Sequence, residues 1–259
     1  MTNNNKLLYL TVFVAALFVA TISGTFAYFQ VSISSNDNYG NVITGQMADV
    51  TITLSVSKLQ PKSNVTVAAN GADLIPFDLI STSNAFNTSS LNSAISNGCI
   101  DNYNYTACDV FKITVKADNT LKIDGYIKIE AGTYEEGGVT KTYNIPNVKW
   151  LLIKSRSTSN YTNIAALNNN LTTGNLVVSN VKPIGVTSTD NLGNSTDGYY
   201  FTNLSSNDQI INTTDSYYYF VVWLEDINDL QDDEGTYKGT VTFRGYGDPE
   251  GKVTASFSG

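Results

Sequence analysis

The chain has 259 residues, of which 42% are hydrophobic and only 15% are charged, so it can bury the core of a globular domain. Its formal net charge of -8 repels phosphate backbones and argues against nucleic acid as a partner. The sequence contains no histidine, which removes the commonest general base and the usual zinc ligand. We therefore expect a protein that is not an enzyme, with no catalytic residue, metal or cofactor.

The N-terminal segment has the order of a signal peptide. A short polar stretch that includes Lys6 precedes an apolar run at residues 7–22. As a helix this run would be about 24 Å long, shorter than the ~30 Å hydrocarbon core of a membrane. Thr25 and Ala27 are small residues in the positions that a signal peptidase requires, so we expect the mature chain to begin at Tyr28. The alternative is an uncleaved helix that continues further and anchors the protein in the membrane.

The first residues of the mature chain alternate as a β-strand does. Phe29, Val31 and Ile33 lie on one face, with polar residues between them. If cleavage frees this strand, it can act as a donor strand that adds to an open sheet edge of a neighbouring copy. Burial of its three apolar side chains would contribute roughly 1.5–3 kcal/mol each. The strand can equally pair within its own chain as a first edge strand, and the pattern alone does not decide between the two.

Two stretches carry a resemblance to a known family. Residues 24–29 have the sequence GTFAYF, and residues 45–50 have the sequence GQMADV. Together they resemble the TasA/camelysin family of exported fibre-forming proteins, over roughly the first fifth of the chain. The resemblance implies processing by a dedicated signal peptidase, a jelly-roll fold, and filaments in which the N-terminal strand of one subunit completes the sheet of the next. The cysteine pair and the tyrosine-rich C-terminal half depart from the family pattern.

The mature chain is predicted to be almost entirely β. Alternating apolar residues predict a strand at residues 50–56, and a hairpin of residues 111–115 and 121–129 around a turn at residues 118–119. Residues 217–224 are apolar on both faces and predict a central strand that is covered on both sides. Further short strands are expected at residues 65–67, 77–79, 148–152, 176–178 and 237–243. Short strands separated by turns predict a two-sheet β-sandwich.

Little helix is expected. Residues 81–98 are rich in Ser and Asn and predict a loop with one short helix, and residues 161–171 predict a second short helix. Cys99 and Cys108 follow the first of these loops, and in an exported chain such a pair predicts a disulfide. The alternatives are two free thiols or half of a metal site, for which the chain has no further Cys or His.

An acidic turn is expected at residues 226–234, directly after Glu225. Its carboxylates are candidates for calcium binding or for acid–base hydrolysis, although their spacing does not match an EF-hand loop. Hydrolysis would require Glu225 or Asp226. Most turns of this kind are solvated acidic surface, which is the interpretation that we favour. The 16 Tyr and 2 Trp residues could form a platform for sugars, but tyrosines in alternating strands more often cover a core.

The expected organisation is a signal peptide or membrane helix at residues 1–27, the donor strand and a linker at 28–41, an all-β sandwich at 42–247 and a polar tail at 248–259. We expect a secreted cell-surface protein that polymerises with itself into a biofilm-type fibre. Its other partners would be the signal peptidase and, before cleavage, the membrane through the N-terminal helix. The alternative is a monomeric, membrane-tethered adhesin or glycan-binding module.

Overall fold

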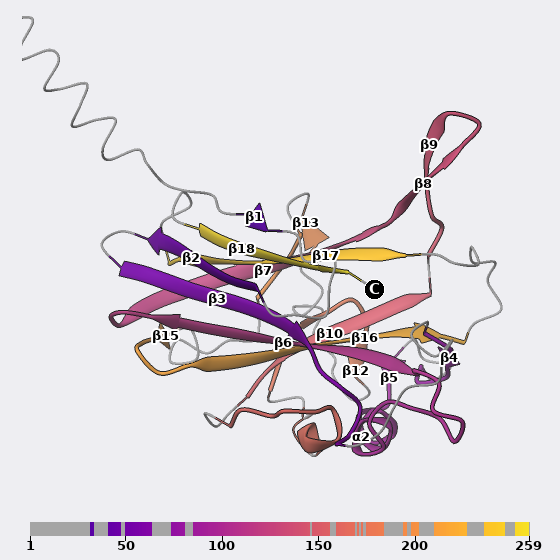
Figure 1. Cartoon of the computed structure of the whole chain (residues 1–259). Helices are drawn as coiled ribbons and strands as arrows, with labels where there is room; N and C mark the ends of the chain where they lie inside the picture. The colour runs from indigo at the N-terminus through magenta and orange to yellow at the C-terminus, as the bar shows by residue number, and fades with distance from the viewer. Residues whose placement is uncertain are drawn as a thin grey trace, which may run out of the picture.

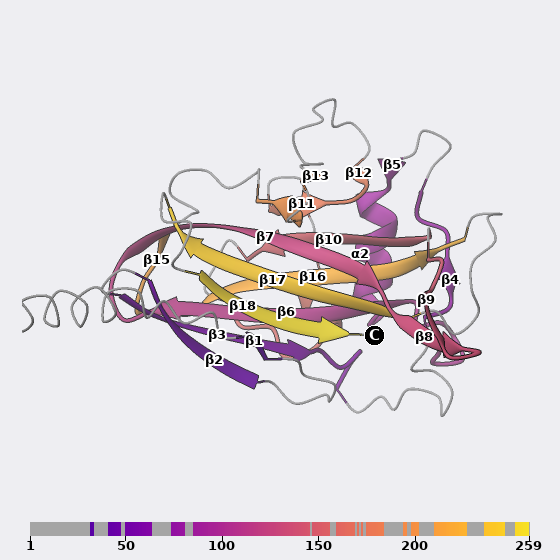
Figure 2. The same cartoon turned by 90° about the horizontal axis from the view of Figure 1, so that it is seen from above.

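Two stacked sheets dominate the computed structural model of the protein (Figures 1 and 2). The structure describes residues 32–33, 41–47, 50–63, 74–80, 85–145, 147–155, 159–168, 170, 172, 175–183, 194–195, 198–201, 210–226, 236–246 and 252–258. Most strand pairs are antiparallel, so the prediction of an all-β two-sheet sandwich is confirmed.

The first sheet, called sheet A, holds the C-terminal strands. Its order is β1 (Ser32–Ile33), β18 (Lys252–Ser258), β17 (Tyr237–Gly245), β7 (Leu121–Ala131), β14 (Gly198–Tyr200) and β13 (Asn194–Ser195). The short strand β15 (Ile210–Ile211) also pairs with β7. The pairs β17–β18 and β17–β7 run antiparallel over most of their length, whereas β1 joins β18 in parallel.

The second sheet, called sheet B, has the order β11 (Leu176–Ser179), β10 (Val148–Lys154), β16 (Ser216–Glu225), β6 (Cys108–Ala117), β3 (Val50–Lys58) and β2 (Asn41–Met47). The two-residue strand β4 (Pro76–Phe77) pairs with the end of β16. Strand β16 therefore lies in the middle of the sheet, between β10 and β6.

Small elements decorate the sandwich. Helix α2 (Thr88–Ser96) begins at Asn87, whose side chain accepts hydrogen bonds from the backbone of Ser89 and Ser90 as an N-cap does. The three-residue 3₁₀ helix η1 (Ala165–Leu167) lies near it, and β12 (Lys182–Pro183) pairs with β5 (Ala85–Phe86). The helix expected within residues 81–98 is thus confirmed, whereas only a single short turn of helix forms within 161–171 among the described residues.

A two-stranded hairpin projects from the end of β7 (Figure 1). It consists of β8 (Thr133–Glu136) and β9 (Val139–Thr142), joined by Gly137 and Gly138. Their φ angles are 61° and 79°, and a two-residue turn with positive φ at both positions favours glycine. This hairpin was not among the elements predicted from the sequence.

The main core fills the space between the two sheets and is rich in aromatic rings. Phe220 of β16 packs against Trp150 and Phe257, with ring centroids 5.5 and 4.8 Å apart. Phe243 of β17 contacts Phe201 and Tyr218. The inward positions of β3, predicted from alternation, are buried here as expected; they are Ile52, Leu54 and Val56.

A second core lies on the outer face of sheet B. Leu91 and Ile95 of α2, with Ile164 and Leu167 around η1, cover the outward side chains of β16. Trp223 of β16 contacts Phe86 there, with ring centroids 6.1 Å apart. Residues 217–223 are all buried, so the prediction of a central strand covered on both sides is confirmed.

The predicted hairpin of residues 111–129 is wrong. Strands β6 and β7 have the expected inward residues, but β6 belongs to sheet B and β7 to sheet A. The turn between them is fixed to β3, because Asp118 accepts a hydrogen bond from the backbone of Thr51 and donates one back to its carbonyl. Alternation identifies the face that each strand buries, but it does not identify the neighbour with which the strand pairs.

The C-terminal segment also differs from the expectation of a polar tail at residues 248–259. Residues 252–258 form β18, and its alternate side chains Val253, Ala255 and Phe257 are buried against the main core. Opposite Phe257 lies Gly239, where a Cβ atom would overlap the phenyl ring. Apolar and polar residues do alternate in the sequence of residues 252–258. This run is short and is flanked by glycines and polar residues, so the pattern did not stand out as a strand.

Replacement of Phe257 by alanine tests this correction. We expect Phe257→Ala to lower the free energy of unfolding by about 3–5 kcal/mol, because a large buried ring is lost from the core. Ser258→Ala, the next residue along the strand, should change it by less than about 0.5 kcal/mol. Denaturant unfolding measures both. If both substitutions changed the free energy of unfolding by the same small amount, residues 252–258 would be a tail and not a core strand.

Candidate functional site

The site predicted from the sequence is the N-terminal donor strand. Thr25, Ala27 and Tyr28 of the expected cleavage site lie outside the described residues, as do Phe29 and Val31. Ile33 lies in β1, of which the structure describes the backbone. Within the expected donor strand, the structure therefore describes Ser32–Ile33.

Strand β1 pairs with β18 of its own chain. Ser32 is the register partner of Thr254, and Ile33 that of Ala255, in a parallel arrangement. On its other side β18 pairs with β17 from Lys252 to Ser258. Among the described residues, β1 is the one strand that pairs with the outer side of β18, and it covers two positions of seven.

Strand β18 lies at the side of the sandwich where the two sheets approach each other. Figures 1 and 2 both show β18 of sheet A beside β2 and β3 of sheet B. Strand β2 is the last strand of sheet B on this side. The edges of both sheets thus meet along one side of the molecule, which we call the β18 edge.

The chemistry of the β18 edge is that of backbone hydrogen bonding. An edge strand presents N–H and C=O groups that a further strand can pair with. The inward side chains of β18 are buried in the core, while Thr254 faces outward and its hydroxyl hydrogen-bonds that of Thr242 on β17 at 2.9 Å. The edge can therefore accept a strand through its main chain without any change in the core.

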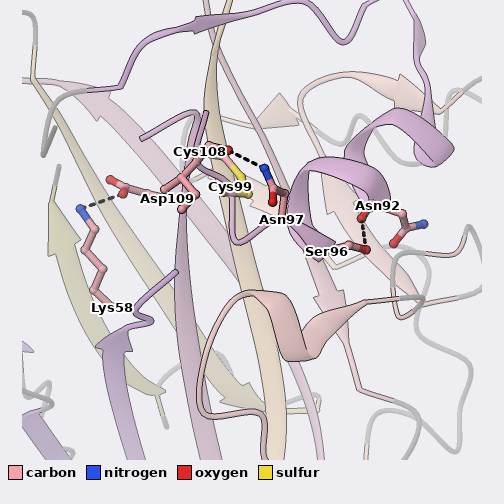
Figure 3. The surroundings of a disulfide bond; sticks show 8 residues. Lys58, Asn92, Ser96, Asn97, Cys99, Cys108 and Asp109 are labelled. Atoms are coloured by element: carbon pink, nitrogen blue, oxygen red, sulfur yellow. Dashed lines mark hydrogen bonds and ion pairs between the residues drawn. A yellow bond between two sulfur atoms is a disulfide. The ribbon is translucent and has the colours of Figure 1, made fainter. Parts of the chain in front are cut away.

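The predicted disulfide partners lie together at the start of β6 (Figure 3). Cys99 and Cys108 are bonded, with Cα atoms 5.1 Å apart, and neither is exposed. The bond anchors the chain that follows α2 to sheet B beside the second core. It acts here as a link within the fold, as expected.

The disulfide closes a loop that presents tyrosines. The Asp101 carboxylate accepts hydrogen bonds from the backbone N–H groups of Tyr103 and Tyr105, both at 2.8 Å. Asn104 has a φ of 65°, a conformation that asparagine tolerates better than most residues. Tyr103 is 77% exposed at the tip. The loop is thus held by hydrogen bonds from its backbone to the Asp101 side chain, and it projects an aromatic ring into solvent.

The acidic candidates divide into two groups. Glu225 is buried, and its carboxylate accepts hydrogen bonds from the backbone of Leu79 and Ile80, at 2.8 and 2.6 Å, and from the Trp223 indole at 2.7 Å. These bonds fix the chain at residues 79–80 against the end of β16. Asp226 is exposed, and residues 227–235 lie outside the described part of the chain.

Sequence reasoning missed a polar cluster inside the main core. Lys58 Nζ lies 2.8 Å from Asp109 Oδ1, and the Tyr237 hydroxyl donates a hydrogen bond to Asp109 Oδ2 at 3.2 Å. Burial raises the pKa of the Asp109 carboxyl above its ordinary value, against the opposing effect of Lys58. Burial and the nearby carboxylate hold the pKa of Tyr237 well above its ordinary value. The sequence signal that could have revealed this cluster is a charged residue at an inward-facing position of a strand, Lys58 in β3 and Asp109 in β6.

The described part of the chain contains no group of three or more Cys, Asp or Glu residues that could hold a metal ion. None of its helices is both long and apolar enough to cross a membrane.

A pair of adjacent substitutions tests the role of Glu225. We expect Glu225→Ala to lower the free energy of unfolding by about 3 kcal/mol, because two buried donors and one part-buried donor lose their acceptor. Asp226→Ala should change it by less than about 0.5 kcal/mol. Denaturant unfolding of both variants is the measurement. A stable Glu225→Ala protein would contradict the structural role that its contacts indicate.

The chain was also compared with known proteins. No protein-family model matches it, and no curated protein matches it.

Proposed function

We propose that this protein is a subunit of an extracellular fibre at the cell surface, in which the N-terminal strand of one subunit pairs with β18 of the next. The observation that carries the proposal is the pairing of Ser32–Ile33 with β18. It identifies the edge to which this segment can bind. The same pairing made between two chains would link subunits head to tail, since the donor and the acceptor are different segments of each chain.

Strand addition at β18 requires the chain's own β1 to leave Thr254 and Ala255, and nothing else in the sandwich has to move. The core side of β18 is complete, and the outer side offers backbone groups in register with the N-terminal segment. Phe29, Val31 and Ile33 add apolar surface to the donor, at roughly 1.5–3 kcal/mol for each side chain that becomes buried. An assembled fibre would gain this burial at every junction.

Export controls when assembly begins. In this proposal the helix at residues 1–27 holds the precursor at the membrane, and the signal peptidase cuts after Ala27. The donor strand from Tyr28 is released only outside the cell, which prevents premature polymerisation. The sandwich would be of the jelly-roll type, as the resemblance to the TasA/camelysin family implies, and its role structural rather than catalytic.

One observation favours a second candidate function. Because Ser32–Ile33 pairs with β18 of the same chain, the subunit can also exist as a closed monomer. Such a monomer, kept at the membrane by an uncleaved N-terminal helix, would be a tethered adhesin or glycan-binding module. The exposed Tyr103 on its braced loop would then be a contact residue.

Cysteines placed in register distinguish the two functions. Paired neighbours in a sheet lie about 5 Å apart, within the range of a disulfide. We expect the variant Ser32→Cys with Thr254→Cys, beginning at Tyr28, to form a ladder of disulfide-linked oligomers on non-reducing gels. Its filaments should be visible by electron microscopy. A closed monomer would instead form the bond within one chain, which peptide mapping detects.

Two controls make this test specific. Ser32→Cys with Ser258→Cys moves the second cysteine four residues along the same face of β18 and should not crosslink. A chain truncated to begin at Asn41 lacks the donor and should remain monomeric. Intrachain bonds alone, with no filaments from the chain that begins at Tyr28, would reject the fibre and support the tethered module.

A further inference from the structure

Lys58, Asp109 and Tyr237 meet at one end of the core between the sheets. Lys58 ends β3 and Asp109 begins β6, two neighbouring strands of sheet B, while Tyr237 comes from β17 of sheet A. All three continue the inward face of their strands. Figure 3 shows the Lys58 side chain extended to Asp109, while Cys108, the preceding residue, points to the other side of β6.

Asp109 and Tyr237 are buried, and Lys58 reaches them from the edge of the core. The Asp109 side chain is 3% exposed and that of Lys58 is 26% exposed. Lys58 Nζ lies 5.9 Å from the centre of the Phe111 ring, and Tyr237 is buried. Burial of the Asp109 carboxylate removes most of its hydration, which takes away part of the advantage of its charged form over the neutral one. The raised pKa of Asp109 has the same physical cause.

We propose that Lys58 and Asp109 become joined by a side-chain isopeptide bond. The amine nitrogen is already held 2.8 Å from one oxygen of the carboxyl group that it would attack. Fixed positions of this kind supply much of what a condensation between two side chains requires. The proposal concerns a modification of the folded chain and stands independently of the fibre.

The reaction balances without any added reactant. A proton passes from the Lys58 ammonium to Asp109 Oδ1, giving a neutral amine and a neutral carboxylic acid. Lys58 Nζ then forms a bond to Asp109 Cγ, and the C–Oδ1 bond breaks. Oδ1 leaves as water with the proton that it received and one from the nitrogen. The products are an amide and one molecule of water.

Tyr237 is placed to assist this step. Its hydroxyl donates to Oδ2, the oxygen on which negative charge develops when the amine adds to the carbonyl carbon. The raised pKa of Tyr237 keeps the phenol in its protonated, donating form. A hydrogen-bond donor at this position therefore stabilises the tetrahedral intermediate of the condensation as well as the starting ion pair.

The bond would close a large covalent ring. Lys58 and Asp109 bracket α2 and the loop that the disulfide closes, so both would lie within one ring that starts and ends on adjacent strands. Strands β3 and β6 could then no longer separate at this end of sheet B when the chain is pulled or heated.

Intact-mass spectrometry of the exported protein, denatured and reduced, tests the proposal directly. The N-terminal residue is determined on the same sample, so that the expected mass is known. We expect most molecules to be lighter than the sequence mass by one water, and a tryptic map to show residues 58 and 109 in one branched peptide. The full sequence mass in correctly folded protein, after days at neutral pH, would overturn the proposal.

Three variants locate the bond. Lys58→Ala should restore the full mass, whereas Lys128→Ala, which removes the lysine of an exposed ion pair, should keep the deficit. A deficit that persists in Lys58→Ala would identify cyclisation of an aspartate instead and would also overturn the proposal. Tyr237→Phe should slow formation about 10²-fold, as loss of one oxyanion donor does. The wild-type mass decides the matter even if a variant fails to fold.

Discussion

The fold depends on one strand that must be covered on both faces. Tyr218, Phe220 and Val222 of β16 face sheet A, while Tyr219, Val221 and Trp223 face the opposite way. Water is excluded from both sides only if a layer lies on each, which is why sheet A covers one face and α2 with η1 the other. The molecule therefore has three layers at this point, with sheet B in the middle. Edges suited to contact with other chains lie away from this centre.

This arrangement determines what the β18 edge can offer a partner. The apolar residues of β18 are already buried in its own core, so the edge presents its main chain and small outward side chains such as Thr254. Recognition there would depend on register and backbone pairing, with apolar burial supplied by the incoming strand. In the proposed fibre, a subunit with such an acceptor would complete its own core before it binds a donor strand.

Residue periodicity was sufficient to predict β3, β16 and the α2 segment, because in each case the apolar residues alone define the buried face. Periodicity did not predict which strands pair with each other. Residues 111–129 appeared to form a hairpin, yet β6 and β7 separate into different sheets, since contacts with β3, β16 and β17 are formed with residues distant in sequence. The pairing of Ser32–Ile33 with β18 could not be predicted, because β18 was concealed within an apparently polar tail. Lys58 and Asp109 were individually visible but unrelated until the strands were paired.

The two buried carboxylates show how similar burial can lead to different chemistry. Glu225 accepts from three N–H donors, two of the backbone and one of an indole, and none of these donors can act as a nucleophile. Asp109 faces an amine that becomes nucleophilic on losing one proton, and a phenol that can support charge on the second oxygen. Burial strengthens the hydrogen bonds that Glu225 accepts. At Asp109, burial weakens the preference for the ion pair over the neutral acid and amine. The identity of the donors, rather than the depth of burial, thus separates a structural carboxylate from a reactive one.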